Sequence, residues 1–330
     1  MRKLLQRHEF FLATITLMMI AAIGLANPVF YSLSNLFDLC KSSTVVGLFA
    51  LGVLVVLVSG GIDVSFAAIG AFSMYVTSRT LLALDFHGSA VIAFLLAGII
   101  GLSLGLFNAV FVAFFRLPTL IVTLGSASLF RGLLLGFIGT TIVNNLPEGM
   151  VRFSKLTMWN STLANGTTTG LSWSFLLFVL AALLVGLLLQ RTMLGRGIYA
   201  MGGNLVAAER AGFNIRRRQL FIYGFVGLLS GVAGIVHACT MRNANPFDLV
   251  GMELNVIAAV VLGGAGITGG RGTVLGTVLG VFLIVTINNS LILLDVPSYW
   301  QKVVTGLVIL VSTGITARSR AQRVRGVGLC

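Results

Sequence analysis

Long apolar runs alternate with short polar stretches along almost the whole chain. A run of roughly 20 apolar residues can cross the hydrocarbon core of a bilayer as one helix. The polar stretches contain most of the charged and turn-forming residues, as loops between spans do. The pattern therefore predicts about ten membrane-spanning helices. They are expected at about residues 10–29, 43–59, 64–84, 89–115, 119–143, 172–190, 219–240, 253–268, 273–294 and 300–317.

The composition agrees with an all-α polytopic membrane protein and excludes a soluble domain. Hydrophobic residues make up 57% of the 330 residues, and charged residues only 9%. A soluble domain carries roughly 25% charged residues, so these few charges could not cover a soluble surface. The net charge of +13 resides mainly in loops, which favours membrane orientation over a nucleic-acid partner. We predict one transmembrane domain over residues 1–330, in contact with membrane lipid.

The basic residues are divided unequally between the two sides of this predicted topology. Ten spans place both termini on one side, which then carries 15 of the 22 Lys and Arg residues; six fall on the other side and Arg131 lies within a span. Cytoplasmic loops carry the excess of Lys and Arg, so both termini are predicted to be cytoplasmic. The long loop at about 190–219 is then cytoplasmic, and the loop at about 144–171 lies outside.

Two glycine-containing segments share one pattern. VVLVSGGIDVSFAAIGAF (55–72) and VVLGGAGITGGRGTVLGTVLGVF (260–282) each join two apolar runs through a Gly-Gly turn. LLALD (81–85) and LILLD (291–295) follow the two turns at similar distances. Transporters are commonly built from structural repeats, and Gly-interrupted helices mark their pathway. We predict two parallel repeats, with both turns on one side of the membrane.

Polar side chains within or beside the predicted spans are the candidates for a pathway. In SGGIDVS (59–65), the glycines permit a break, and the serines and the aspartate can satisfy freed backbone groups. A charge such as Arg131 is costly inside a span, which favours an ion pair or hydrogen-bond clamp, with Asp63 as candidate partner. Hydrogen bonds between helices are the alternative role for the amides and hydroxyls. The candidate pathway residues are Ser59, Asp63, Ser65, Asn108, Thr123, Arg131 and Asn288.

The 190–219 loop has the pattern of two short helical segments rather than of a disordered linker. In NLVAAERAGF (204–213), Asn204 is a suitable N-cap and Gly212 a suitable end. GRGIYAMGGN (195–204) predicts another helical turn before it. Small apolar positions alternate with charges, whereas a loop that only sets topology needs only charge. The loop therefore has the character of a docking surface for a partner.

The chain has no nucleotide-binding or catalytic motif. No G-x-x-x-x-G-K-[ST] sequence occurs, so the chain is not expected to cradle ATP phosphates itself. GAGITG (264–269) matches G-x-G-x-x-G but lies between apolar runs, where a membrane turn is expected instead of a dinucleotide site. No metal-ligand or catalytic spacing is found, so we predict a non-enzymatic subunit without cofactor or metal.

Four blocks of the sequence resemble the permease subunits of bacterial ABC importers for sugars (ribose, arabinose, xylose, galactose) and for autoinducer-2. With the intervening helices they cover most of the chain in order. The blocks are VSGGIDVS (58–65), LPTLIVTLGSASLFRGL (117–133), LGRGIYAMGGNLVAAERAGFNIRRRQLFIYGFVGLLSGVAGI (194–235) and IAAVVLGGAGITGGRGTVLGTVLGVF (257–282).

The resemblance implies import of a monosaccharide-like solute, a ribose-type sugar or related polyol, across the bacterial inner membrane. It also implies three partners: an ABC ATPase subunit that binds ATP, a periplasmic solute-binding protein, and a second permease subunit, identical or different. Arg216, Arg217 and Arg218 are expected to anchor a helix at the lipid surface. The residues carried over as ATPase-coupling residues are Gly195, Arg196, Tyr199, Gly202, Gly203, Asn204, Ala207, Ala208 and Gly212.

One departure from the family and two alternative functions remain. Phe66 and Ala67 follow Ser65, where the family has an apolar residue and a glycine. An ion-coupled secondary transporter would need a functional carboxylate in the membrane, for which Asp63 and Glu253 qualify. A non-transporting membrane scaffold would show no solute-dependent stimulation of an ATPase.

Overall fold

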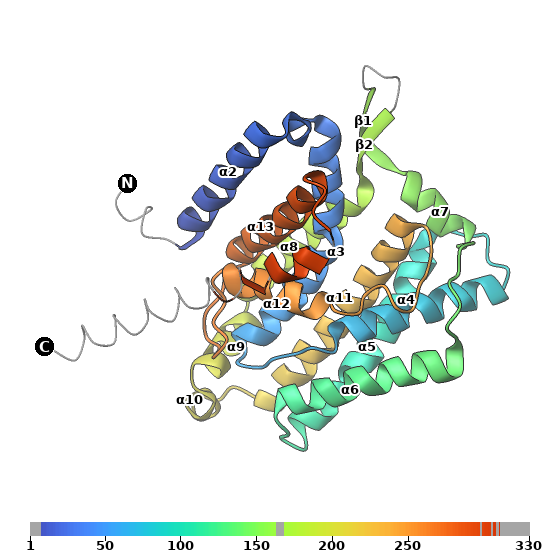
Figure 1. The fold of residues 1–330 in the computed structure, drawn as a ribbon. Coiled ribbons are helices and arrows are strands. Elements are labelled where there is room, and N and C mark those ends of the chain that lie inside the picture. The colour runs from blue at the N-terminus through green and yellow to red at the C-terminus, as the bar shows by residue number, and fades with distance from the viewer. Residues whose placement is uncertain (1–7, 163–167, 298, 305, 308–309, 311–330) are drawn as a thin grey trace, which may run out of the picture.

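The computed structural model describes residues 8–162, 168–297, 299–304, 306, 307 and 310, which form a bundle of helices (Figure 1). Seven helices among these residues are long and apolar enough to cross a membrane, and two shorter apolar helices accompany them. The elements are α2 (His8–Ala26), η1 (Pro28–Tyr31), α3 (Leu33–Val58), α4 (Phe66–Ala83), α5 (Ala90–Ala113), α6 (Thr119–Leu133), η2 (Leu134–Ile138), α7 (Glu148–Lys155), β1 (Thr157–Thr162), β2 (Thr168–Ser172), α8 (Trp173–Arg191), α9 (Met193–Gly203), α10 (Leu205–Arg210), α11 (Ile215–Met241), α12 (Met252–Leu262) and α13 (Val274–Leu293).

Most of the predicted spans correspond to helices, but the span at 253–268 does not. Helix α12 has 11 residues, which gives a length of about 16 Å, too short for a hydrocarbon core of about 30 Å. The glycine-rich turn that begins at Gly263 ends the helix early, and residues 242–251 before it are irregular. The expectation of a full span here is therefore wrong. The last predicted span, 300–317, lies mostly outside the described residues. Its described beginning is helical, as part of a helical stretch at 299–304.

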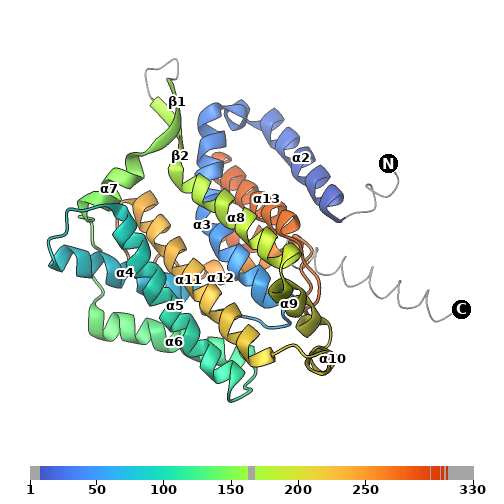
Figure 2. The ribbon, with the colours of Figure 1, turned by 180° about the vertical axis from the view of Figure 1, so that it is seen from behind.

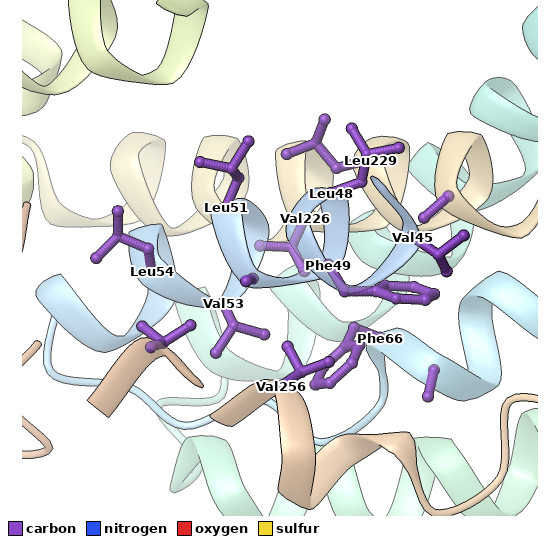
Figure 3. Packing of buried hydrophobic residues seen from close by; sticks show 14 of the residues in the cluster. Val45, Leu48, Phe49, Leu51, Val53, Leu54, Phe66, Val226, Leu229 and Val256 are labelled. Carbon is purple, nitrogen blue, oxygen red and sulfur yellow. The ribbon is translucent and has the colours of Figure 1, made fainter. Parts of the chain in front are cut away.

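Helix α3 forms the centre of the bundle and packs against α11, α8, α13 and α12. Its second half is buried on all sides, as expected for a helix enclosed by others. Figure 3 shows the apolar side chains packed at this centre, Phe49 and Phe66 among them. The ring centroids of Phe49 and Phe66 are 5.2 Å apart. Phe66 is fully buried. The aromatic residue that departs from the family pattern is thus accommodated by packing against α3.

Helices α5 and α11 cross with their backbones in contact. A Cβ atom placed on Gly101 would lie 2.2 Å from the Gly227 carbonyl oxygen, and one on Gly227 would lie 2.1 Å from that of Gly101. Gly105 and Gly231 continue the same contact along the two helices. Small residues at such a crossing let membrane helices approach closely, where dispersion contacts replace the missing hydrophobic driving force. The abundance of glycine therefore has a direct packing role here.

The two glycine turns of the predicted repeats meet at one end of the bundle. A Cβ atom on Gly269 would lie 2.7 Å from the Cα atom of Gly60, which confirms that both turns face the same side. The helices that leave the turns also end alike. The Phe86 amide donates to the Leu81 carbonyl, and the Val296 amide donates to the Leu291 carbonyl, which are the same type of cap.

The predicted loop at 144–171 is more ordered than a simple polar connection. It contains α7 and the antiparallel pair β1 and β2, a small exception to the all-α fold. Figure 2 shows this hairpin at the opposite end of the bundle from α9 and α10. We call these the hairpin end and the α9–α10 end. The first turn of α2 lies at the α9–α10 end, because the Thr273 hydroxyl there donates to the Glu9 carboxylate at 3.1 Å.

We expect Gly227→Ala to destabilise the protein by about 1–3 kcal/mol, the usual cost of overpacking a tight contact. The added methyl group meets the backbone of α5, which cannot move aside without opening the crossing. Thermal unfolding in detergent would measure the effect. Gly186→Ala is the matched control, because nothing lies within 4 Å of its Cβ position. Equal melting temperatures for the two variants would contradict the proposed role of the crossing.

Candidate functional site

The 190–219 loop folds into the two helices α9 and α10, each with its own cap. The Gly195 amide donates to the Thr192 hydroxyl at 3.0 Å, and the Ala207 amide donates to the Asn204 side chain at 3.0 Å. Gly212 has φ +85° and ends α10 in the left-handed region. The predictions that Asn204 is the N-cap of α10 and that Gly212 ends this helix are therefore confirmed. Helix α9 has 11 residues and is longer than the single turn expected.

The outer surface of this loop carries five of the nine expected coupling residues. Arg196, Gly203, Asn204, Ala207 and Gly212 are exposed. Next to them α10 exposes two larger apolar side chains, which were not among the nine. They are Leu205, 49% exposed, and Val206, 57% exposed. An apolar pair directly after an N-cap, outside any span, was the signal that could have identified them.

The other four expected coupling residues face the bundle. Gly195 and Ala208 are buried, and Tyr199 and Gly202 are half-buried. The Tyr199 hydroxyl donates to the Gly272 carbonyl at 2.7 Å, and partial burial raises the pKa of this phenol. These four contact the rest of this chain on their inner side, so the loop is divided into an outward-facing and an inward-facing set.

The arginines that follow the loop differ in their surroundings. The Arg218 guanidinium lies 4.5 Å from the centre of the Phe213 ring. It also donates to the Asn214 carbonyl at 3.2 Å, and a Cβ atom on Gly197 would meet it. Arg218 therefore joins α9 to the start of α11, while its expected role as a lipid anchor stays a prediction. Arg216 and Arg217 remain exposed.

The break at 59–65 is an extended segment that runs from the α9–α10 end into the bundle. Its backbone is held by the first turns of α6, because the Ile62 amide donates to the Thr119 hydroxyl at 3.0 Å and the Val64 amide to the Thr123 hydroxyl at 3.3 Å. Non-helical backbone is tolerated at membrane depth only where its polar groups are satisfied inside the protein. Thr123 is therefore a structural donor and acceptor for the break.

Asp63 lies near the end of the break, two residues before Ser65, the N-cap of α4. Its carboxylate accepts hydrogen bonds from the Ser65 amide at 2.6 Å and the Ser65 hydroxyl at 2.7 Å. The Asn108 side chain on α5 donates to the Ser65 hydroxyl at 2.8 Å. All three side chains are buried, and a carboxylate is favourable at a helix N-terminus. The structure thus brings Asp63, Ser65 and Asn108 into one cluster, beside Thr123.

Arg131 is paired with Glu253, and not with Asp63 as expected. Its guanidinium on α6 donates to the Glu253 carboxylate on α12. The correction follows from the fold, since the Asp63 carboxylate is directed to the start of its own helix. Glu253 was recognised only as a candidate carboxylate, because no pattern in the sequence links residues 122 positions apart. Asn288 lies on α13, away from the elements that form the Asp63 cluster.

A cavity of about 840 Å³ opens at the α9–α10 end between the loop and the break. Its walls are the break, the connection between α5 and α6, the loop helices and the first turns of α11. Ser59 and Gly61 line it beside the Tyr223 ring. The lining combines apolar side chains with hydroxyls, amides, two arginines and one glutamate. The cavity connects the outside of the loop with the segment that leads to Asp63.

The comparisons with known proteins agree with this arrangement. The family described as the branched-chain amino acid transport system / permease component matches residues 35–313. The ribose import permease protein RbsC of Bacillus subtilis (strain 168) is 34% identical over 305 residues, which are 92% of this chain and 91% of that protein. RbsC of Escherichia coli (strain K12) is 32% identical over 296 residues, 90% of this chain and 89% of that protein.

A relative with another cargo in its name is also similar. The autoinducer 2 import system permease protein LsrC of Yersinia enterocolitica is 30% identical over 294 residues, 89% of this chain and 78% of that protein. No solved structure matches the chain. The family match covers residues 35–313, which include the loop, the break and both glycine turns, and the relatives are similar over 89–92% of this chain. This integral membrane protein therefore belongs to the family of transport-system permease components, the non-catalytic membrane subunits of ABC importers.

Proposed function

We propose that this chain is one of two permease subunits of an ABC importer for a monosaccharide-like solute, a ribose-type sugar or related polyol. A periplasmic solute-binding protein delivers the solute to the hairpin end. A separate ABC ATPase binds the α9–α10 end and supplies energy from ATP. The second permease subunit is identical or different. The choice of solute rests on the names of the relatives, which include ribose import permeases.

The single observation that carries the ATPase contact is the outward face of α9 and α10. This face presents Arg196, Asn204, Leu205 and Val206 on two short capped helices, at one end of a bundle of apolar helices. A small apolar patch with a charged neighbour is typical of an interface core and rim. The start of α2 lies at the same end of the bundle. The distribution of Lys and Arg favours a cytoplasmic location of this end. The single-domain organisation and both cytoplasmic termini belong to this proposal.

The two carboxylates that an ion-coupled transporter would need have other roles in this fold. Asp63 accepts two hydrogen bonds at the start of α4, and Glu253 is paired with Arg131. Neither group needs to exchange a proton or a cation with solvent to explain its position. This supports energy supply by a partner ATPase over coupling to an ion gradient.

We expect Gly203→Trp to abolish binding of the ATPase without unfolding the permease. Gly203 is exposed and nothing lies within 4 Å of its Cβ position, so the indole would project into the proposed interface. The measurement is affinity purification of the tagged chain in mild detergent, with identification of a P-loop ATPase and assay of its solute-stimulated activity. Gly203→Ala is the matched control and is expected to bind as the unchanged protein does. An ATPase bound equally by the Trp variant would contradict the assigned surface.

We expect Asp63→Asn to retain most of the uptake of the solute, because the amide oxygen can still accept the hydrogen bonds from Ser65. Asp63→Ala is expected to leave the buried Ser65 amide and hydroxyl without their acceptor and to destabilise the protein by about 1–3 kcal/mol. Uptake of labelled D-ribose, L-arabinose, D-xylose and D-galactose into cells carrying the complete importer would measure the first effect, and thermal unfolding the second. Complete loss of uptake in well-folded Asp63→Asn would instead favour ion coupling.

A further inference from the structure

We propose that Tyr199 and Gly202 are positioning residues that transmit ATPase-driven movement of α9 to both glycine turns of the membrane domain. The inference rests on the proposed function, because it needs an ATPase bound at the α9–α10 end. It adds a route for the movement inside this chain. The route consists of direct backbone contacts between α9, the break at 59–65 and the turn at 263–272, which we call the glycine junction.

The first part of the route is the contact of Gly202 with both turns. A Cβ atom on Gly202 would lie 1.9 Å from the Val58 carbonyl oxygen and 2.5 Å from the Gly270 nitrogen. The Gly270 amide donates to the same Val58 carbonyl at 2.9 Å. The Val58 carbonyl at the end of α3 therefore accepts a hydrogen bond from the second glycine turn and is also in close contact with Gly202 of α9. Contacts this close between backbones leave no side chain that could rearrange to absorb a displacement.

The second part of the route is the hydrogen bond from Tyr199. Its hydroxyl donates to the Gly272 carbonyl at 2.7 Å, directly before the cap of α13 at Thr273. Tyr199 lies three residues before Gly202 on α9, so the two residues occupy the same face of the helix. The turn at 263–272 is thus held at two points, Gly270 and Gly272, by one face of α9.

The third part of the route is the place to which the first turn leads. The break continues from the junction along α6, where Thr119 and Thr123 hold its backbone, and ends at the Asp63 cluster. Displacement of α9 would therefore change the position of the break, the start of α4 and the first turns of α6 together. Gly60 has φ +86° and Gly269 has φ +87°, so both turns use backbone conformations that other residues rarely adopt. The cavity lies directly beside this path, lined by Ser59 and Thr268.

The other face of α9 and α10 is free to bind a partner while the inner face stays in the junction. Gly203 follows Gly202 directly, yet its Cβ position has no neighbour within 4 Å. The Cβ positions of two adjacent glycines thus have opposite surroundings: that of Gly202 lies in the junction, whereas that of Gly203 is open although its backbone lies beside Gly270. Gly202→Ala and Gly203→Ala are therefore a matched pair of variants, of which only the first adds a methyl group inside the junction.

The test uses the complete importer with its ATPase in nanodiscs, in a background with Cys40, Cys239 and Cys330 replaced by Ser. Ser59→Cys reports on the first turn and Thr268→Cys on the second. The labelling rate of each cysteine by a charged maleimide is measured without nucleotide and with Mg-ATP and vanadate. The ratio of the two rates is the readout, and it requires no knowledge of the transported solute.

We expect Tyr199→Phe to reduce the nucleotide-dependent ratio at Thr268→Cys by up to about fivefold, the equilibrium factor of one ordinary hydrogen bond. The amount of bound ATPase should stay unchanged, and the melting temperature should fall no further than in Tyr31→Phe, which loses the same type of hydrogen bond; this separates positioning from a structural role. Tyr31→Phe is the control, because it removes a hydroxyl-to-carbonyl bond of α2 far along the chain from the loop. Gly202→Ala should reduce the ratio at both reporters, and Gly203→Ala at neither.

The outcomes are distinguishable from one another. If the ATPase does not bind the unchanged permease, the proposed function itself fails. If the ATPase binds but neither reporter responds to nucleotide, or if Tyr199→Phe keeps the full ratio at Thr268→Cys, the positioning role is overturned and the proposed function stands. If Gly202→Ala does not fold, Tyr199→Phe still decides the question.

Discussion

In the hydrocarbon core of a membrane, helices gain little by burying apolar side chains, because the lipid is equally apolar. The packing of this protein depends instead on how closely its backbones approach one another. At the crossing of α5 and α11, and again where α9 meets the two glycine turns, a single methyl group would overlap a carbonyl oxygen. The same constraint thus forms both the frame of the bundle and the contact between its loop and its core.

Close backbone contact also determines where polar groups can be placed. The break at 59–65 leaves peptide groups without helical partners, and they are satisfied by Thr119 and Thr123 on α6. The carboxylate that begins α4 is satisfied by Ser65, which is in turn held by Asn108 on α5. Four polar side chains at the break, those of Asp63, Ser65, Thr119 and Thr123, are therefore occupied with maintaining an interrupted helix.

The division of the loop into two faces connects this packing with the biological role of the family. A membrane subunit that has no ATP site of its own needs a surface for an ATPase and a mechanical connection to its own helices. Under the proposal made above, the exposed face of α10 meets the first requirement, and Tyr199 and Gly202 meet the second. The residues from Tyr199 to Val206 include both, so under this proposal a short stretch of sequence carries two different functions.

The sequence by itself determined the features that depend on local pattern. Apolar runs located most of the spans, Asn204 and Gly212 bounded α10, and the paired Gly-Gly turns indicated the repeats. The partner of Arg131, the inward direction of Gly202 and the short length of α12 were decided only by the tertiary structure. Capping and hydropathy act over a few neighbouring residues, so they can be read along the chain. Pairing across 122 positions, and the choice of which glycine meets another backbone, depend on how whole helices cross in space.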